Sequence, residues 1–143
     1  MVDVFFVRYD AGGHAGTLVP VRRRVPPGGA DGRLRTALRA LLAGPSPEER
    51  QRGLVTEIPP GTDLHDVRVH GKGVVVDLTP AFGGGGGSTS MVARVWQVVY
   101  TASQVRGIPE VQILLDGRRV RTLGGEGVVI GTPLRRPPSV PTF

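Results

Sequence analysis

The alternation of apolar and polar positions predicts strands at the start of the chain and again in its middle. Residues 2–9 are rich in β-branched and aromatic side chains and end at a turn-forming cluster, which is typical of a strand. Residues 18–25 resume the alternation. Pro20 places this second strand at a sheet edge or a bulge, because proline cannot donate to a sheet ladder. The clearest local prediction is a hairpin of residues 67–69 and 74–78 around a glycine-rich turn.

Shorter apolar runs predict the remaining strands. Residues 54–58 form a run that ends at a Pro-Pro-Gly turn, and residues 111–115 alternate before a return strand that ends at Leu123. Residues 128–130 add a short last strand. With the helices described next, these strands predict a single α+β or α/β domain, with a mixed sheet of about five or six strands and both main helices on one face.

Helical periodicity and stop signals predict two main helices and one short helix. Asp31 is the expected N-cap of the first main helix, which ends near Ala43. Its leucines share one apolar stripe, formed by Leu34, Leu38, Leu41 and Leu42. The short helix begins at Ser46, with Pro47 at the first helical position, followed by acidic residues that favour the positive end of the helix dipole.

The second main helix is expected to end near Arg106. Its cap is expected among the hydroxyl residues Ser88, Thr89 and Ser90. Its apolar face consists of Val92, Val95, Trp96, Val99 and Ala102. Arg94 and Gln97 fall elsewhere on the helix. Because valine is a poor helix former, tertiary packing must stabilise this helix.

Composition indicates one small globular domain. The chain has 143 residues, of which 39% are hydrophobic and 21% are charged, as in globular proteins with a single core. Cysteine is absent, which excludes a disulfide framework and a thiol nucleophile. We assign residues 1–131 to the domain and residues 132–143 to a proline-rich tail that is extended or disordered.

Charge and hydropathy bear on location and partners. Eighteen basic residues against 12 acidic ones give a net charge of +6, which attracts anionic partners. No apolar run reaches the roughly 20 residues that a membrane-spanning helix needs. The first residues lack the basic start of a signal peptide. We therefore expect either a cytoplasmic protein or a chain from which an export signal has been removed.

Several short motifs follow one another along nearly the whole chain. The first half carries residues 4–6, 38–45, Leu54, Thr56, 58–62, Leu64 and Val67. The second half carries residues 76–78, Phe82, 97–101, 111–117 and 133–136. Each motif alone is unspecific, but their order and spacing resemble the GerMN domain, the sporulation and spore germination domain of bacterial cell-envelope proteins.

This resemblance implies an α/β fold similar to the ring-building motifs of secretion and sporulation complexes. It implies no enzymatic activity and no cofactor. It also implies a location outside the cytoplasm, with membrane association only through an anchor. The expected partners are another protein, further copies of the chain, or both. Two departures from the family are the missing anchor and a long glycine run at residues 83–87.

The glycine run at residues 83–87 precedes a helix start, where backbone N–H groups attract anions. A phosphate-binding loop would also need a lysine beside a Ser or Thr at the helix start, and residues 88–90 contain no lysine. Consecutive glycines have a large ordering entropy. We therefore interpret the run as a flexible connector.

Candidate catalytic groups are few. Asp77 and Asp116 each end a predicted strand and would support acid–base chemistry if they met across a cleft, but strand-exit and hairpin-turn roles explain them better. The histidines are His14, His65 and His70; the last two project to opposite faces of a strand and cannot readily share a metal ion. Ser88, Ser90 and Ser103 lack the glycine-flanked elbow of a hydrolase nucleophile. We predict no catalytic residue, cofactor or metal site.

Arginine clusters are the least ordinary feature of the sequence. One group would share a surface if the second strand packed beside the first helix: Arg22, Arg23, Arg24, Arg33, Arg35 and Arg39. A second group is Arg118, Arg119 and Arg121. Such patches neutralise phosphates on nucleic acid, anionic lipid or wall polymer. A solvated, solubilising face is the simpler interpretation, and we favour it.

We therefore expect a non-catalytic, envelope-associated domain that mediates self-assembly or binds a protein through an unpaired strand edge or a helix face. The alternative is an arginine-rich anion-binding module for nucleic acid or anionic wall polymer. A third interpretation, a hydrolase of envelope material, would need clustered carboxylates in a cleft.

Overall fold

The computed structural model describes residues 1–125 and 127–143, whose strands form three small sheets. The sheets contain β1 (Val2–Tyr9) with β2 (Gly16–Arg23), then β3 (Leu64–His70), β4 (Gly73–Leu78) and β5 (Glu110–Leu115), and last β6 (Thr122–Leu123) with β7 (Val128–Val129). The helices are α1 (Ala30–Ala43), α2 (Pro47–Gln51), the 3-10 helix η1 (Pro80–Gly83) and α3 (Ser88–Ala102). None of these helices is long and apolar enough to cross a membrane. The predicted α+β class is confirmed.

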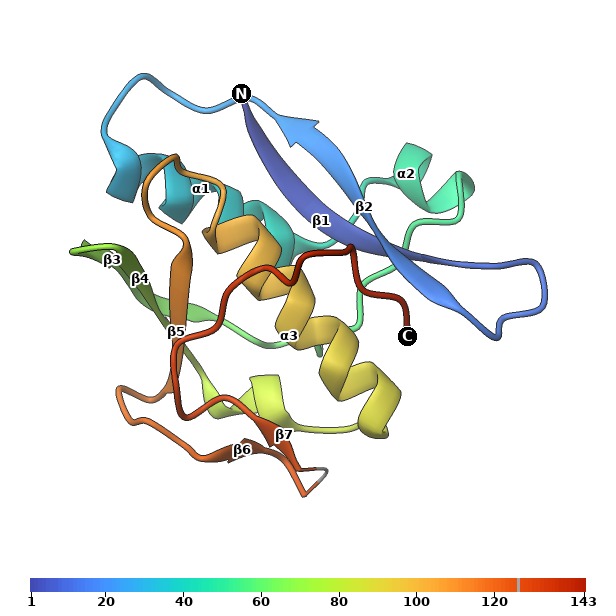
Figure 1. Ribbon diagram of the computed structural model, residues 1–143. Helices are drawn as coiled ribbons and strands as arrows, with labels where there is room; N and C mark the ends of the chain where they lie inside the picture. The colour runs from blue at the N-terminus through green and yellow to red at the C-terminus, as the bar shows by residue number, and fades with distance from the viewer. Residues whose placement is uncertain (126) are drawn as a thin grey trace.

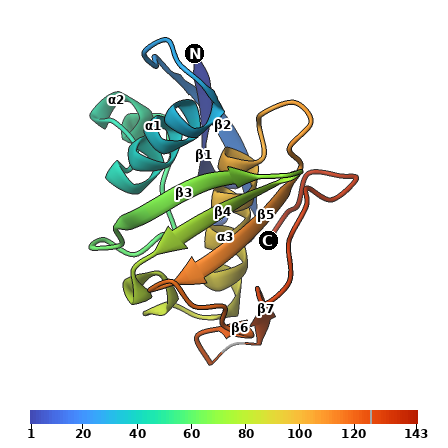
Figure 2. The ribbon, with the colours of Figure 1, turned by 90° about the vertical axis from the view of Figure 1, so that its left-hand side faces the viewer.

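α1 and α3 lie on the side of the three-stranded sheet that faces the β1–β2 hairpin (Figures 1 and 2). β3 and β4 are antiparallel, whereas β4 and β5 are parallel and are connected through α3, as a parallel pair requires. α1 packs against β1, β3 and α3. α1 and α3 therefore connect the β1–β2 sheet to the three-stranded sheet through side-chain packing. The strands are divided among small sheets instead of forming the single sheet of five or six strands that we predicted.

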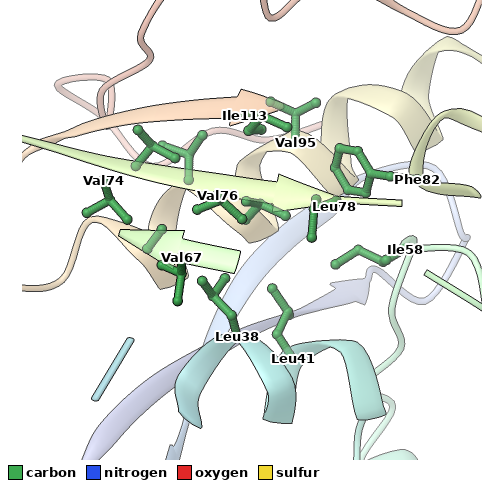
Figure 3. Packing of buried hydrophobic residues seen from close by; sticks show 14 of the residues in the cluster. Leu38, Leu41, Ile58, Val67, Val74, Val76, Leu78, Phe82, Val95 and Ile113 are labelled. Atoms are coloured by element: carbon green, nitrogen blue, oxygen red, sulfur yellow. The ribbon is translucent and has the colours of Figure 1, made fainter. Parts of the chain in front are cut away.

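The main core lies between the three-stranded sheet and the helices (Figure 3). Its side chains include Val67, Val74, Val76, Leu78 and Ile113 from the sheet, Leu38 and Leu41 from α1, and Val95 from α3. A second cluster contains Phe5, Val7, Leu18, Ala93 and Tyr100. Residues of β1 alternate between the two clusters, because successive strand residues face opposite sides. Both faces of β1 are therefore buried.

The outer edge of β1 is completed by a polar stripe, formed by Gln97 and Thr101 of α3 and by Gln104, two residues past the end of α3. The N–H of Asp3 donates to Oε1 of Gln104 (2.8 Å), and Nε2 of Gln104 donates to the Asp3 carbonyl (2.7 Å). The N–H of Phe5 donates to Oγ1 of Thr101 (3.2 Å), and Nε2 of Gln97 donates to the Phe5 carbonyl (3.1 Å). Gln97, Thr101 and Gln104 recur at helical spacing. This polar stripe takes the place of a neighbouring strand, which explains why the sheet stops at β1.

Two predicted strands differ in the structure. Of residues 54–58, only Val55 pairs, exchanging backbone hydrogen bonds of 2.8 Å with Val7. The return strand after residue 115 does not form a ladder with β5: β6 pairs with β7, and Leu115 meets only Arg118 in a single bridge. The outer edge of β5 is instead occupied by residues of the C-terminal tail.

The helix ends correct the predicted caps. Gly29, and not Asp31, is the N-cap of α1, and Asp31 lies in the first turn, near the positive end of the helix dipole. Gly87 is the N-cap of α3, so none of the expected hydroxyls caps it, and the helix ends at Ala102 instead of Arg106. The short helix α2 follows the prediction: Ser46 caps it in a capping box with Glu49.

Gln97→Leu tests the polar stripe of α3. The Gln97 side chain is fully buried, and its amide hydrogen-bonds the Phe5 carbonyl, Oγ1 of Thr56 and the N–H of Glu57. Leucine leaves buried backbone groups without partners, so the free energy of unfolding from urea denaturation is expected to fall by about 2–4 kcal/mol. The matched control, Gln51→Leu at the exposed end of α2, is expected to change it by less than about 0.5 kcal/mol. Equal losses in both variants would contradict the role of the stripe.

Candidate functional site

The glycine run before α3 is held by a buried arginine. Arg94 is 2% exposed, and burial lowers the pKa of its guanidinium from the ordinary value. The guanidinium donates at 2.7–2.9 Å to the carbonyls of Phe82, Gly84 and Gly85 and to Oγ of Ser90. A Cβ at Gly86 would lie 2.8 Å from the Arg94 guanidinium, and Gly86 has a φ of 79°, so glycine is required there. The run is hydrogen-bonded to α3, in contrast to the flexible connector that we predicted.

Asp77, within β4, is half-buried, and Asp116, directly after β5, is exposed; both lie beside the turn at residues 116–117. Oδ1 of Asp77 accepts a hydrogen bond from the Gly117 N–H (2.8 Å). Oδ1 of Asp116 lies 2.7 Å from Nε2 of His65, and these two side chains are 56% and 46% exposed. Solvent weakens charge interactions at such a site. The geometry supports the turn role that the sequence indicates, although the residue pattern does not predict the contact between His65 and Asp116. Across the described residues, no group of three His, Cys, Asp or Glu side chains is placed to hold a metal ion.

The hydroxyl groups serve as hydrogen-bond partners of structural residues. Ser90 accepts from Arg94, and Ser103 accepts from Arg136 at 2.8 Å. Burial, together with the hydrogen bond and the negative charge of Glu57, raises the pKa of Tyr9 to about 12. The Tyr9 hydroxyl therefore stays protonated and donates to Glu57 (2.6 Å).

Arg23 is the most enclosed of the arginines predicted to form an anion-binding surface. Its guanidinium donates to both carboxylate oxygens of Glu49, each at 2.7 Å. The guanidinium also lies 6.0 Å from the centre of the Phe6 ring. The Arg23 hydrogen bond, aided by the Ser46 N–H, lowers the pKa of Glu49 to about 2. This pair fixes α2 against the hairpin.

The other predicted arginines are more exposed and do not form one uniform surface. Arg22 lies 3.7 Å from Asp3, Arg35 lies 3.5 Å from Asp66, and Arg33 donates to the Met1 carbonyl at 3.4 Å. Arg24 and Arg39, like the second group Arg118, Arg119 and Arg121, are exposed. Since Arg22, Arg23 and Arg35 each face an acidic side chain, the positive charge available to an external anion is reduced.

Within the part of the chain that the structure describes, no strand pairs with the outer edge of β3. β3 is the outer strand of its sheet, and no isolated bridge involves its outer side. The Val67 carbonyl points to this side, because it accepts from Arg35 at 3.3 Å. Alternate residues of an antiparallel strand point the same way, so Val69 also presents its N–H and carbonyl at this edge. A hollow of about 490 Å³ beside it is lined by Arg39, Leu42 and Leu64, among others.

Similarity to known proteins extends over most of the chain. The model of the family Germane, described as "Sporulation and spore germination", matches residues 3–121. No curated protein matches the chain.

Solved structures share the fold at low sequence identity. The tandem GerMN domains of the sporulation protein GerM from Bacillus subtilis match with a TM-score of 0.77 and 19% identity, over 97% of this chain and 46% of that one. The first GerMN domain of GerM matches with a TM-score of 0.74 and 18% identity, over 95% and 97%. A Clostridium perfringens structure titled "Putative Lipoprotein" matches with a TM-score of 0.68 and 19% identity, over 94% and 86%.

Glu49→Gln tests the Arg23–Glu49 pair through pH. Because the folded-state pKa of Glu49 is lowered from 4.5 to about 2, the pair stabilises the chain above about pH 4.5, and this contribution is lost as the pH falls toward 2. Between about pH 5 and 2.5, the unmodified chain is expected to lose about 2 kcal/mol more unfolding free energy than Glu49→Gln. Glutamine retains the capping box.

The matched control for this measurement is Glu48→Gln, an exposed neighbour in the same helical turn. It should keep the pH dependence of the unmodified chain. If Glu49→Gln also kept the pH dependence of the unmodified chain, the Arg23–Glu49 pair would not be the source of that pH dependence.

Proposed function

The chain belongs to the Germane family of sporulation and spore germination domains, and on this basis we propose that it is a non-catalytic interaction domain of the cell envelope. It assembles with copies of itself or binds a protein partner. The observation that carries this proposal is the unpaired outer edge of β3. Such an edge recruits a strand from another chain, because its N–H and C=O groups lack ladder partners.

In this mechanism a partner strand adds to the sheet beside β3. Its backbone bonds the N–H of Val67 and the N–H and carbonyl of Val69. Side chains next to the edge then determine which strand fits: Arg68 is 66% exposed, and Arg35 and Asp66 lie in contact beside it. If the added strand came from a different surface of the next copy, the contact would repeat head to tail and build a ring or filament. A ring agrees with the resemblance to ring-building motifs.

The contacts of the candidate catalytic groups support a binding role. Asp77 holds the Gly117 N–H, Asp116 contacts an exposed histidine, and Ser90 and Ser103 accept from arginines. Each of these groups has a structural partner in the described fold. General acid–base chemistry needs groups placed to reach a substrate proton, and these partners direct them to the turns and helix ends instead.

The proposed location is outside the cytoplasm. It rests on analogy with two proteins: the Clostridium perfringens protein, described as a "Putative Lipoprotein", and the sporulation protein GerM. Membrane attachment would come from an anchor and not from the described helices.

The alternative function, binding of nucleic acid or anionic wall polymer, has weaker support. Arg22, Arg23 and Arg35 already face acidic side chains. A polyanion affinity that falls steeply with ionic strength would favour this alternative, because neutralised phosphates release counterions.

Val69→Pro tests the β3 edge. Proline lacks the N–H that position 69 presents there, and edge strands tolerate it. If the edge mediates self-association, size-exclusion chromatography with light scattering at millimolar concentration should show a clearly lower mean mass for the variant than for the unmodified chain. Circular dichroism should show that both are folded.

The control, Arg22→Pro, makes the same change on β2 at the position opposite Asp3. This position lies on the outer side of β2, two residues from the natural Pro20, so the variant should keep the oligomer. An unmodified chain that stays monomeric under these conditions would remove self-assembly from the proposal and leave only binding to a different protein.

A further inference from the structure

The C-terminal tail, residues 132–143, crosses the domain from the three-stranded sheet to the hairpin (Figure 1). Near its start, Leu134 and Val111 of β5 exchange two backbone hydrogen bonds of 2.8 Å. At its end, the Phe143 N–H donates to the Gly16 carbonyl of β2 (3.0 Å), and the Gly16 N–H donates to the Phe143 carbonyl (2.5 Å). The tail thus forms short antiparallel pairs with the outer edges of two different sheets.

Between these pairs, Arg136 binds the C-terminal end of α3. One guanidinium NH₂ group donates to the Tyr100 carbonyl (2.7 Å), and Nε donates to Oγ of Ser103 (2.8 Å). The guanidinium lies 4.7 Å and 5.3 Å from the ring centres of Tyr100 and Phe5, within the range of cation–π attraction. A cation here also faces the negative end of the helix dipole. The negative end of α3, the two hydrogen-bond acceptors and the two aromatic rings together form a site that favours an arginine side chain.

The surface beneath the tail is aromatic. Phe5 and Tyr100 pack edge to face with ring centres 5.3 Å apart, and Trp96 and Tyr100 also pack edge to face, with ring centres 6.3 Å apart. Phe143 joins this cluster. Its ring approaches Gly16 so closely that a Cβ at Gly16 would lie 2.9 Å from it. Removal of the tail would expose this apolar area to water, which is unfavourable, so the surface is stable with a tail bound to it.

The composition and attachment of the tail favour exchange between copies. Its anchoring contacts are with residues far away in sequence, and residues 130–131 connect it to β7. Pro133, Pro137, Pro138 and Pro141 keep it extended, so little conformational entropy is lost on binding. Fully extended, residues 132–143 reach about 40 Å. The same bonds form whether the tail comes from its own chain or from another.

We propose that the surface formed by Phe5, Tyr100, Ser103 and the strand edges at Gly16 and Val111 binds the C-terminal tail of a second copy of this chain. Exchange of tails links copies through contacts that already exist within one copy. The tail contacts lie on β2, β5 and α3, so this interaction is independent of the β3 edge.

Engineered cysteines test the exchange, because the chain has no cysteine of its own. Thr17 and Thr142 face each other across the pair between β2 and the tail, and both are exposed. Two variants of the chain, Thr17→Cys and Thr142→Cys, are mixed at millimolar concentration, equilibrated and oxidised. Only a tail bound to another copy brings these two positions together. An affinity tag on one chain allows disulfide-linked heterodimers to be counted on a non-reducing gel, and a chain with both substitutions shows that the geometry permits the bond.

Exchange predicts several-fold more heterodimer than a control mixture in which Thr122→Cys, at an exposed position of β6, replaces Thr17→Cys. Adding Arg136→Ala to the Thr142→Cys chain should lower the excess about tenfold, since it removes the ring contacts and two hydrogen bonds. Adding Val69→Pro should leave the excess unchanged, which separates tail exchange from the β3 edge. A heterodimer yield equal to the control, or one insensitive to Arg136→Ala, would overturn the exchange and identify the tail as a permanent strap of its own chain.

Discussion

The arrangement of the fold depends on how the outer edge of β1 finds hydrogen-bond partners. The backbone groups of Asp3 and Phe5 lie against α3, where no further strand can pair with them. A buried backbone group without a partner costs about 1–3 kcal/mol. Gln97, Thr101 and Gln104 satisfy these groups with side chains. This requirement sets the rotation of α3 and its distance from the hairpin, and it places α3 between the hairpin and the three-stranded sheet (Figure 1).

Polar side chains connect elements inside the fold in other places as well. Arg94 donates hydrogen bonds to the carbonyls of Phe82, Gly84 and Gly85, and so fixes the segment that precedes α3. Glu49 both caps α2 and pairs with Arg23 of the hairpin. Because these groups already have partners within the chain, the backbone edges of the strands become the main candidates for contact with other molecules.

The strand edges differ in what occupies them, and the two proposals follow from that difference. Side chains of α3 and the backbone of Val55 supply hydrogen-bond partners to the outer edge of β1. The tail pairs with part of the outer edges of β2 and β5. Within the tail, Leu134 packs against the main core and Phe143 against the second cluster. At the outer edge of β3, the Val67 carbonyl accepts a hydrogen bond from the Arg35 side chain, and no strand pairs with this edge in the described structure. A partner would therefore add a strand beside β3. In tail exchange, the tail of a second copy would instead replace the chain's own tail at the edges of β2 and β5.

The local sequence determined those elements whose hydrogen bonds connect residues that are close together in the chain. The β3–β4 hairpin follows from alternation around a tight turn, the α2 capping box from Ser46 and Glu49, and the edge position of β2 from Pro20. Partners far apart in sequence were decided by tertiary structure. Gln97 and Arg94 follow the pattern of a polar helix face, yet both are buried, because the backbone groups they bond belong to β1 and to the glycine run. The contact of His65 with Asp116, the position of the tail and the open edge of β3 likewise depend on which strands become neighbours, and residue patterns along one chain do not encode that directly.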